Sequence, residues 1–442
     1  MSLKVGMISL GCPKNQVDAE IMLNTLVADG YTLCADENEC DVIIVNTCGF
    51  IGDAKQEAIN TIIELGELKQ TGKLKKIVVT GCLAQRYSEQ ILSELPEVDA
   101  VVGLGENVNI AKVVECVAKD TAPFCLRGEK ENLSLDGDRV LTTPNYTAYL
   151  RIADGCDNFC TYCAIPYIRG KNRSRKLENI IAEARSLAEG GAKEIILVAQ
   201  DTTRYGDDLY GKYMLPTLLD ELQKIEGIEW IRMLYTYPDK ITDELIDAMK
   251  RNDKVLHYLD IPMQHRSTTV LKAMNRHYAG EELDTLIEKL RSSMPDITIR
   301  TTFIVGFPGE SEQDFTELCE FVQRAKFNRM GAFCYSAEED TPAAEFDGQI
   351  EESVKQRRHE VIMAEQSVVN DKQAENQIGK VHTCLVEGYD RMNKCYFGRT
   401  KMDAPDIDGK IFFMSENKHN AGDMVELKVY DRIDYDLLGE II

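Results

Sequence analysis

The feature that most constrains the fold is a regular alternation of short β-branched segments and helical segments, which occurs twice along the chain. In the first 125 residues the predicted strands are Lys4–Ser9, Asp41–Val45, Lys76–Thr80 and Ala100–Gly105. Helical segments separate these strands, and strands joined in this way pair in parallel through right-handed crossovers. The sequence therefore predicts an amino-terminal α/β domain with a parallel sheet.

The second alternation begins at Thr147. Its predicted strands are Thr147–Ile152, Glu194–Val198, Trp230–Leu234, Leu256–Asp260, Thr298–Ile304 and Arg329–Tyr335. Six strand–helix repeats favour a partial barrel of the TIM type, in which the functional site lies at the carboxyl ends of the strands.

These patterns divide the chain into domains. We expect the amino-terminal domain at 1–125, a weakly patterned linker at 126–144 and the partial barrel at 145–372. Short alternating segments with Gly-Asp, Asp-Gly and Asn-rich turns predict a small antiparallel β-barrel at 373–442.

Composition limits the class of partner and the compartment. The 442 residues include 74 Asp and Glu but only 51 Lys and Arg, a formal net charge of −23. This charge disfavours an obligatory nucleic-acid partner and favours a basic protein, although solubility alone accounts for it equally well. We find no apolar stretch long enough for a membrane helix and no signal peptide, so a cytoplasmic location is expected. Cytosolic cysteines are read as metal ligands or packing residues rather than disulfides.

Cys156, Cys160 and Cys163 form a CxxxCxxC run, called here the contiguous trio, directly after the first predicted barrel strand. Three thiolates in one loop can hold three irons of a four-iron cluster, and the fourth iron stays open for a chelating small molecule. Tyr162 lies inside this loop. It is expected either to pack against such a ligand or to serve ordinary loop packing.

Cys12, Cys48 and Cys82, called here the scattered trio, each lie just past the end of a predicted strand. Because the carboxyl ends of parallel strands share one edge of a sheet, the fold can bring these cysteines together. We therefore expect a second metal site rather than three unrelated structural cysteines. The other cysteines are interpreted as packing residues: Cys34, Cys40, Cys116, Cys125, Cys319, Cys334, Cys384 and Cys395.

Glycines that precede or follow the barrel strands are candidates for close backbone approach to the small ligand, although most such glycines only make turns. The candidate ligand-binding residues are Gly190, Gly191, Glu194, Gly306 and Gly309.

A basic segment follows the cysteine loop and contains Arg169, Lys171, Arg173, Arg175 and Lys176. It could offset the charge of a thiolate-bound cluster, orient a substrate carboxylate or be a solvated loop. Within it, Arg169 and Arg175 are the candidate substrate-positioning residues. His265, after the fourth barrel strand, is read as a structural or substrate-positioning residue.

The CxxxCxxC loop with an aromatic residue before its last cysteine resembles the radical S-adenosylmethionine (SAM) enzymes. Its continuation, Ala164-Ile165-Pro166-Tyr167-Ile168-Arg169-Gly170, is similar to the methylthiotransferase branch. That branch carries a second four-iron cluster on three amino-terminal cysteines and a carboxyl-terminal TRAM barrel. The resemblance thus covers essentially the whole chain and implies that the small ligand is SAM.

Two subfamilies fit this resemblance. The segment Ser9-Leu10-Gly11-Cys12-Pro13-Lys14-Asn15-Gln16-Val17-Asp18 is similar to the RimO type, which modifies an aspartate of small-subunit ribosomal protein twelve. The segment Asp260-Ile261-Pro262-Met263-Gln264-His265 also resembles that type. The alternative is the MiaB type, which methylthiolates an adenosine in transfer RNA. The acidic charge agrees with a basic protein substrate.

The resemblance also implies a mechanism with two clusters and two uses of SAM. A 5′-deoxyadenosyl radical made at the contiguous trio removes a hydrogen from the β-carbon of the aspartate. The scattered trio carries or supplies sulfur, which a second SAM methylates. Such a reaction needs an electron donor, such as a flavodoxin or ferredoxin, and a sulfur donor. The two clusters would have to face one cavity.

Overall fold

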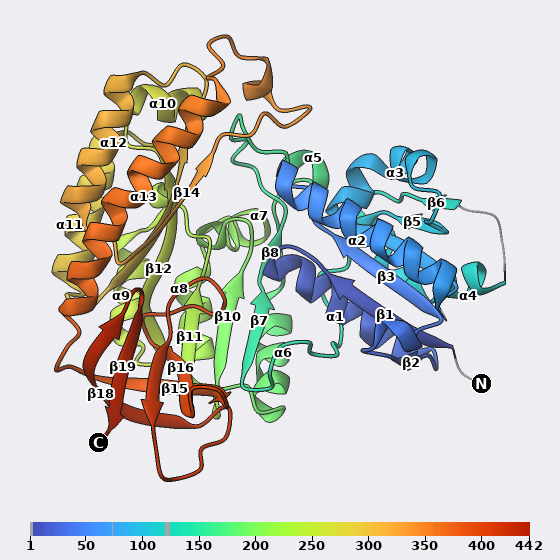
Figure 1. Cartoon of the computed structure of the whole chain (residues 1–442). Helices are drawn as coiled ribbons and strands as arrows, with labels where there is room; N and C mark the ends of the chain where they lie inside the picture. Colours follow the sequence, from blue (N-terminus) through green and yellow to red (C-terminus); the bar gives the residue numbers. More distant parts are fainter. Residues whose placement is uncertain (1–2, 73, 120–123) are drawn as a thin grey trace.

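The structure is a computed structural model that describes residues 3–72, 74–119 and 124–442. Three parts follow one another along the chain (Figure 1): an amino-terminal α/β domain, a larger open barrel beside it and a small β-barrel below the open barrel.

The amino-terminal domain is a parallel sheet of six strands in the order β2-β1-β3-β4-β5-β6. The strands are β1 (Lys4–Ser9), β2 (Thr32–Leu33), β3 (Val42–Thr47), β4 (Lys76–Gly81), β5 (Ala100–Val102) and β6 (Phe124–Leu126). The helices are α1 (Pro13–Ala28), α2 (Gly52–Thr71), α3 (Cys82–Glu94) and α4 (Ile110–Ala118). Buried Val and Ile residues of β3 and β4 form apolar cores on both faces of the sheet, which explains their continuous apolar runs.

Sequence patterning missed the two edge strands of this sheet. β2 has only two residues and β6 only three, too few to show a periodic pattern. The expected strand at 100–105 ends at Val102, and a 3₁₀ segment, Leu104–Asn109, follows it.

The central part is an open parallel sheet in the order β14-β13-β12-β11-β10-β7. Its strands are β7 (Thr147–Arg151), β10 (Glu194–Val198), β11 (Trp230–Met233), β12 (Val255–Gln264), β13 (Thr298–Val305) and β14 (Arg329–Cys334). The longer helices are α6 (Leu177–Glu189), α8 (Leu215–Leu222), α9 (Asp243–Arg251), α11 (Gly280–Ser293), α12 (Glu312–Ala325) and α13 (Glu352–Glu375). The largest apolar core lies between the sheet and these helices.

The shorter elements of the central part lie around the cysteine loop and the strand ends. They are β8 (Ala153–Asp154), α5 (Ile165–Arg169), β9 (Arg173–Ser174), α7 (Asp207–Tyr210) and α10 (Thr268–Ala273). β8 and β9 form an antiparallel pair, which ties the start of the cysteine loop to the segment after it.

The carboxyl-terminal part is a closed barrel of five strands: β15 (Val381–Asp390), β16 (Cys395–Thr400), β17 (Ile411–Met414), β18 (Met424–Ile433) and β19 (Asp436–Ile441). The expectation of a purely antiparallel barrel needs one correction. β19, which sequence patterning missed, pairs with β17 in parallel and with β18 in antiparallel fashion, and so closes the barrel.

This small barrel covers the amino ends of the open-barrel strands. The buried carboxylate of Glu194, the first residue of β10, binds Arg232 at 2.8 Å and Arg399 of β16 at 2.5 Å. The hydroxyl of Tyr258 donates to Asp408 at 2.7 Å. The amino-terminal domain instead inserts α1 against the inner face of the sheet, where Val17 and Ile21 pack with strand residues.

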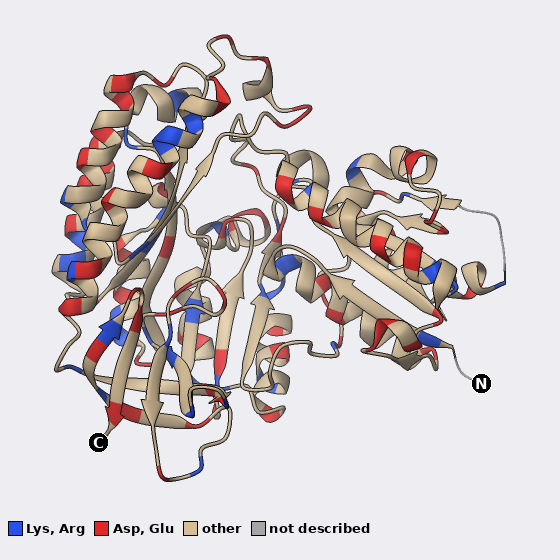
Figure 2. Ribbon diagram, in the orientation of Figure 1, with Lys and Arg blue, Asp and Glu red and all other residues tan. Residues whose placement is uncertain are grey.

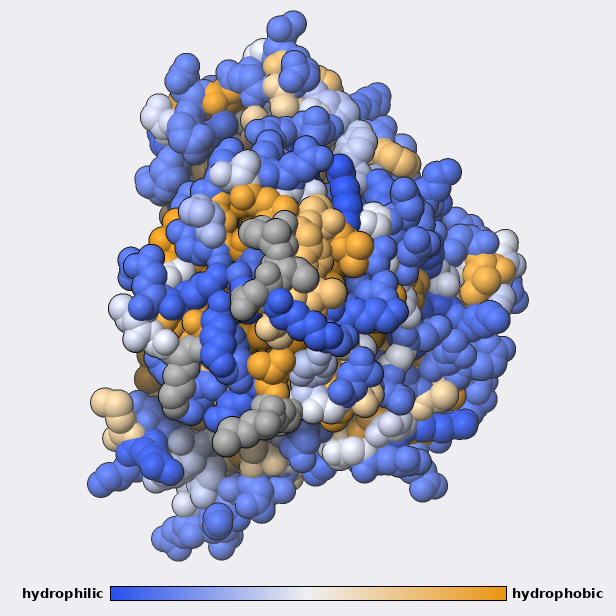
Figure 3. Space-filling view, turned by 90° about the vertical axis from the view of Figure 1, so that its right-hand side faces the viewer, coloured by the Kyte–Doolittle hydropathy of each residue, from blue (hydrophilic) through white to orange (hydrophobic). Residues whose placement is uncertain are grey.

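The surface is acidic and mostly hydrophilic. Asp and Glu residues are spread over all three parts (Figure 2). The face turned toward the viewer in Figure 3 is largely hydrophilic, with a smaller apolar area near its centre. Within the described ranges, no helix is both long enough and apolar enough to cross a membrane.

Candidate functional site: two cysteine trios between the amino-terminal domain and the barrel

Three neighbouring strand ends of the amino-terminal sheet present the scattered trio. Cys12 caps α1 after β1, Cys48 follows β3, and Cys82 is the first residue of α3 after β4. The strand ends are aligned, because Ser9 lies opposite Asn46 and Thr47 opposite Gly81.

The backbone packs tightly around these cysteines. A Cβ atom on Gly11, whose φ is +91°, would lie 2.6 Å from the Cβ of Cys48 and 3.1 Å from its Sγ. A side chain at this position would therefore displace Cys48. The register of the sheet and the missing side chain at Gly11 together bring Cys12 and Cys48 into one small region.

The thiols of the scattered trio differ electrostatically. Burial opposes ionisation of Cys12, but the positive charges of Lys14 and Arg169 outweigh it and hold the pKa of this thiol below its usual value. Burial raises the pKa of Cys82 to about 12 and also raises that of Cys48. As ligands of a metal, Cys48 and Cys82 would each have to lose a proton.

The contiguous trio lies in the loop after β7 and β8. The Cys156 N–H donates to the carbonyl of Gly170, and the Cys163 N–H donates to the carbonyl of Cys160, both within 3.1 Å. Phe159, at φ +45°, makes the turn and is exposed. This exposed phenyl ring marks the outer side of the loop, whereas Cys160 beside it is buried.

Cys160 contacts a cation. Arg276 places Nη1 3.6 Å from the Cys160 Sγ, and the Tyr237 hydroxyl lies 3.9 Å from the same sulfur. The Arg276 guanidinium stacks on the Tyr237 ring. Its Nε–H donates a hydrogen bond to the Tyr278 hydroxyl oxygen at 2.7 Å, which fixes the orientation of the guanidinium. Burial raises the pKa of Cys156 to about 12 and that of Cys163 further.

The two trios adjoin one another. Cys82 packs in a small apolar cluster with Leu104, Ala164 and Ile168, and Ala164 directly follows Cys163. Among the described residues, no three Cys, His, Asp or Glu side chains already surround a single-ion site. A set of three thiols is the donor set of a four-iron cluster in which one iron has no protein ligand.

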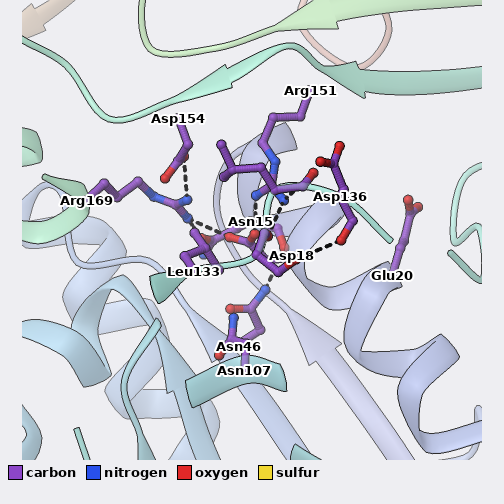
Figure 4. Close-up of polar contacts among 12 residues, drawn as sticks. Asn15, Asp18, Glu20, Asn46, Asn107, Leu133, Asp136, Arg151, Asp154 and Arg169 are labelled. Atoms are coloured by element: carbon purple, nitrogen blue, oxygen red, sulfur yellow. Dashed lines mark hydrogen bonds and ion pairs between the residues drawn. The ribbon is translucent and has the colours of Figure 1, made fainter. Parts of the chain in front are cut away.

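The predicted substrate-positioning residue Arg169 has a different role in the structure. It is buried at the domain boundary, where it bonds Asp18 of α1 and Asp154 of β8, each at 2.9 Å (Figure 4). Its Nη2 also donates to the side chain of Asn15 at 2.6 Å. Asp18 in turn accepts from the buried Arg151 of β7. Arg169 therefore joins the two domains beside the trios and has its donors committed to protein acceptors.

Arg175 is likewise committed to the protein. It bonds Asp136 and Glu183, both at 2.6 Å, and donates to the carbonyl of Arg151 at 2.7 Å. Of the basic segment, only Lys171 and Lys176 are exposed. Both guanidinium groups make buried contacts within the protein, which do not support a substrate-positioning role for Arg169 and Arg175, and that role stays a prediction.

The predicted ligand-binding residues do not all share one face. Gly190 and Gly191 precede β10, and Glu194 begins it, whereas the cysteine loop follows the carboxyl end of neighbouring β7. Glu194 is also saturated by Arg232 and Arg399. These three residues lie at the opposite end of the barrel, and their assignment to the SAM site is wrong.

Gly306 and Gly309 do lie at the carboxyl end of β13, but the surroundings of Gly306 are filled by protein groups. The backbone N–H groups of Gly306 and Phe307 donate to the Glu310 carboxylate at 2.6 and 3.0 Å. A Cβ on Gly306 would meet the Lys355 side chain at 2.3 Å. Gly306 thus accommodates α13 rather than a ligand, while Gly309 faces open space and stays a prediction.

Tyr162 and His265 lie on the carboxyl-end side. Tyr162 packs, partly buried, with Phe307 and Tyr335, and its packing against SAM stays a prediction. His265 is fully buried, and its Nδ1 accepts from the Ser267 N–H at 2.9 Å. Burial lowers its pKa to about 3, so the ring is neutral. A structural role fits His265 better than contact with a substrate.

Sequence reasoning missed Asp18, Lys14 and Arg276. Asp18 directly follows the buried Val17 of α1 and is itself buried, and a carboxylate at a buried helix position indicates an ion pair. Lys14 is buried beside Cys12, and no local pattern marks it as buried. Arg276 reaches Cys160 from a distant loop. Two cysteines assigned to packing, Cys116 and Cys125, are exposed instead.

Comparison with protein families adds three matches in the order of the three parts. The model described as "Uncharacterized protein family UPF0004" matches residues 4–103, the radical SAM superfamily matches 150–322, and the TRAM domain matches 378–442. The solved radical S-adenosylmethionine methyltransferase TsrM from Kitasatospora setae has a similar fold. Its TM-score is 0.57 at 12% identity, over 78% of this chain and 75% of that one.

Full-length relatives are more similar. "Ribosomal protein uS12 methylthiotransferase RimO" of Clostridioides difficile is 49% identical over 440 residues, which cover 100% of this chain and 99% of the relative. The protein of the same name from Geobacter sulfurreducens is 50% identical over 444 residues, covering 99% and 98%. Identity at this level over the whole length identifies the chain as a radical SAM methylthiotransferase of the RimO family.

Proposed function

We propose that this protein methylthiolates the β-carbon of an aspartate in ribosomal protein uS12, with one four-iron cluster on each cysteine trio. The observation that carries the proposal is the juxtaposition of the two trios at the boundary between the amino-terminal domain and the barrel. The names of the full-length relatives support the substrate. The charge of −23 agrees with a basic ribosomal protein.

The donor sets suit this chemistry. Three thiolates leave one iron of a four-iron cluster open, and a cluster with an open iron supplies one-electron chemistry able to open a strong C–H bond. Cys156, Cys160 and Cys163 would hold the cluster that binds SAM. Cys12, Cys48 and Cys82 would hold the cluster that presents sulfur.

The surrounding residues orient and shield these ligands. Arg276 brings a positive charge and an N–H to Cys160, which offsets the negative charge of a thiolate-bound cluster. Arg169, between Asp18 and Asp154, holds the two domains together beside Cys82. The exposed side of the contiguous loop, around Phe159, leaves an approach for an electron donor such as a flavodoxin or ferredoxin. A separate sulfur donor is also required.

The test is anaerobic reconstitution of both clusters, followed by reduction with dithionite in the presence of SAM and purified uS12. We expect peptide mass spectrometry to locate an added methylthio group on one aspartate. Unmodified transfer RNA serves as the competing substrate. Modification of an adenosine with no change in uS12 would contradict the proposal and favour the transfer-RNA reaction.

A further inference from the structure

Lys14, the second residue of α1, carries its ammonium out of the amino-terminal domain and into the mouth of the open barrel. Its side chain is 6% exposed, and Nζ lies 3.4 Å from the centroid of the Tyr235 ring. Tyr235 comes just after β11, at the carboxyl end of the strand. The contact therefore crosses the boundary between the two domains at the level of the trios.

Within the described ranges, this ammonium has no carboxylate partner; its contact is the Tyr235 ring face. After burial, which disfavours the charged form, the groups that act on it electrostatically are Cys12, Arg169 and the carboxylates of Asp154 and Asp260. Both carboxylates are engaged elsewhere. Asp154 binds Arg169 at 2.9 Å. Asp260 binds Arg300 at 2.8 Å and accepts from the Tyr235 N–H at 3.1 Å. Lysine is almost never buried unless it is paired.

The position of Lys14 indicates which carboxylate could pair with its ammonium. Lys14 is two residues from Cys12 of the scattered trio, and Tyr235 also lies within electrostatic reach of Cys12. The ammonium thus lies between the scattered trio and the mouth of the barrel that carries the contiguous trio. In the proposed function, the substrate β-carbon has to reach this same region.

We propose that Lys14 binds the side-chain carboxylate of the substrate aspartate and thereby selects aspartate over its amide. This inference rests on the proposed function. The ammonium offers three donors and the aromatic face occupies only one side of it, so donors remain for a carboxylate. The β-carbon is bonded directly to that carboxylate, so a bond to Lys14 also places the carbon that reacts.

A different role would be to offset the negative charge of a cluster at Cys12. Replacing Lys14 would then change the affinity for every substrate equally. If Lys14 binds the carboxylate, its replacement changes the affinity only for substrates that carry that carboxylate. The two roles are separated by changing the enzyme and the substrate together, as in a double-mutant cycle.

The experiment uses full-length reconstituted enzyme with SAM and two substrates: uS12, and uS12 in which the aspartate modified by the wild type is replaced by asparagine. Dissociation constants are measured anaerobically for wild type, Lys14→Met and Lys75→Met. Methionine approximates the aliphatic stem of lysine without its charge, and removal of a buried charge need not destabilise the fold. Lys75 is the matched control because it is exposed on the same domain.

We expect wild type and Lys75→Met to bind the asparagine form roughly 10- to 100-fold more weakly, as for loss of one charged hydrogen bond. Lys14→Met should bind both forms equally, at unchanged iron content. A Lys14→Met enzyme that keeps the wild-type preference overturns the inference, as does equal weakening for both forms with loss of iron. A wild type that modifies no aspartate overturns the proposed function and this inference together.

Discussion

Cys156, Cys160 and Cys163 come from one loop of eight residues, whereas Cys12, Cys48 and Cys82 come from three strand ends separated by whole helices. The first set needs only its loop, held by short backbone hydrogen bonds, to bring its ligands together. The second set needs the register of a parallel sheet and the insertion of α1 into the barrel. The same three-thiol chemistry therefore depends on local sequence at one site and on long-range folding at the other.

The largest effects come from removing each trio. The triple replacement of Cys156, Cys160 and Cys163 by alanine should abolish both SAM cleavage and methylthiolation. The triple replacement of Cys12, Cys48 and Cys82 should abolish methylthiolation but leave SAM cleavage. Iron analysis and the yield of 5′-deoxyadenosine check this, and each variant should retain half the iron. Loss of all iron in either variant would show that the two sites are not independent.

The next largest effects come from breaking the buried ion pairs at the two ends of the barrel, since only one end lies beside the trios. Asp18→Asn leaves Arg151 and Arg169 without their shared carboxylate, and Glu194→Gln does the same to Arg232 and Arg399. Each should lower the free energy of unfolding by about 3–5 kcal/mol.

Denaturant unfolding measures the stability loss of both variants. Only Asp18→Asn should also reduce methylthiolation, because Asp18 lies beside the scattered trio and Glu194 at the far end. If Glu194→Gln lost as much SAM binding as Asp18→Asn, Glu194 would belong to the SAM-binding site after all.

Gly11→Ala should disturb the scattered trio alone. The new methyl group would lie 2.6 Å from the Cβ of Cys48, at a φ of +91°. Gly30→Ala is the matched control, since Gly30 has φ +87° and nothing within 4 Å. Both variants should lose about 1–2 kcal/mol from backbone strain. Iron analysis should show a deficit in Gly11→Ala only. A similar deficit in Gly30→Ala would show that the contact with Cys48 is not the cause.

Arg276→Met should change the contiguous site alone. Without the positive charge and N–H near the Cys160 Sγ, the oxidised cluster is favoured and its reduction potential should fall. Redox titration followed by electron paramagnetic resonance measures this for the variant that lacks the scattered trio. An unchanged potential would mean that Arg276 acts only through packing on Tyr237.

The last prediction concerns the pH dependence of stability on the barrel side, away from both trios. His265 has a pKa of about 3 in the folded protein and about 6.5 when unfolded. Between pH 4 and 6 the unfolded chain binds a proton that the folded protein refuses, so stability rises with pH, by up to about 1.4 kcal/mol per unit. His265→Gln should flatten this slope in denaturant unfolding across that range. If the pH dependence of the free energy of unfolding were unchanged in His265→Gln, a group other than His265 would take up this proton.

Local patterns predicted the parts of the molecule that local physics decides. The strand bounds of Lys4–Ser9 and Glu194–Val198 follow from apolar β-branched runs, and the structure has the same bounds. The edge strands β2 and β6 were missed because segments of two or three residues carry little periodic signal. Glu194 was assigned to the wrong end because a glycine-preceded strand start resembles a ligand loop in sequence alone.

The sequence by itself determined the α/β class and the order of the three parts, and it marked six cysteines as candidate ligands, because strand and helix periodicity and the CxxxCxxC spacing are local properties. Only the tertiary structure decided which charged side chains are buried between domains. Arg169, Arg175 and Glu194 are committed to ion pairs, while among the described residues Lys14 is buried against the Tyr235 ring and not against a carboxylate. The physical reason is that burial and pairing depend on residues far apart in the chain, and no short window contains both partners.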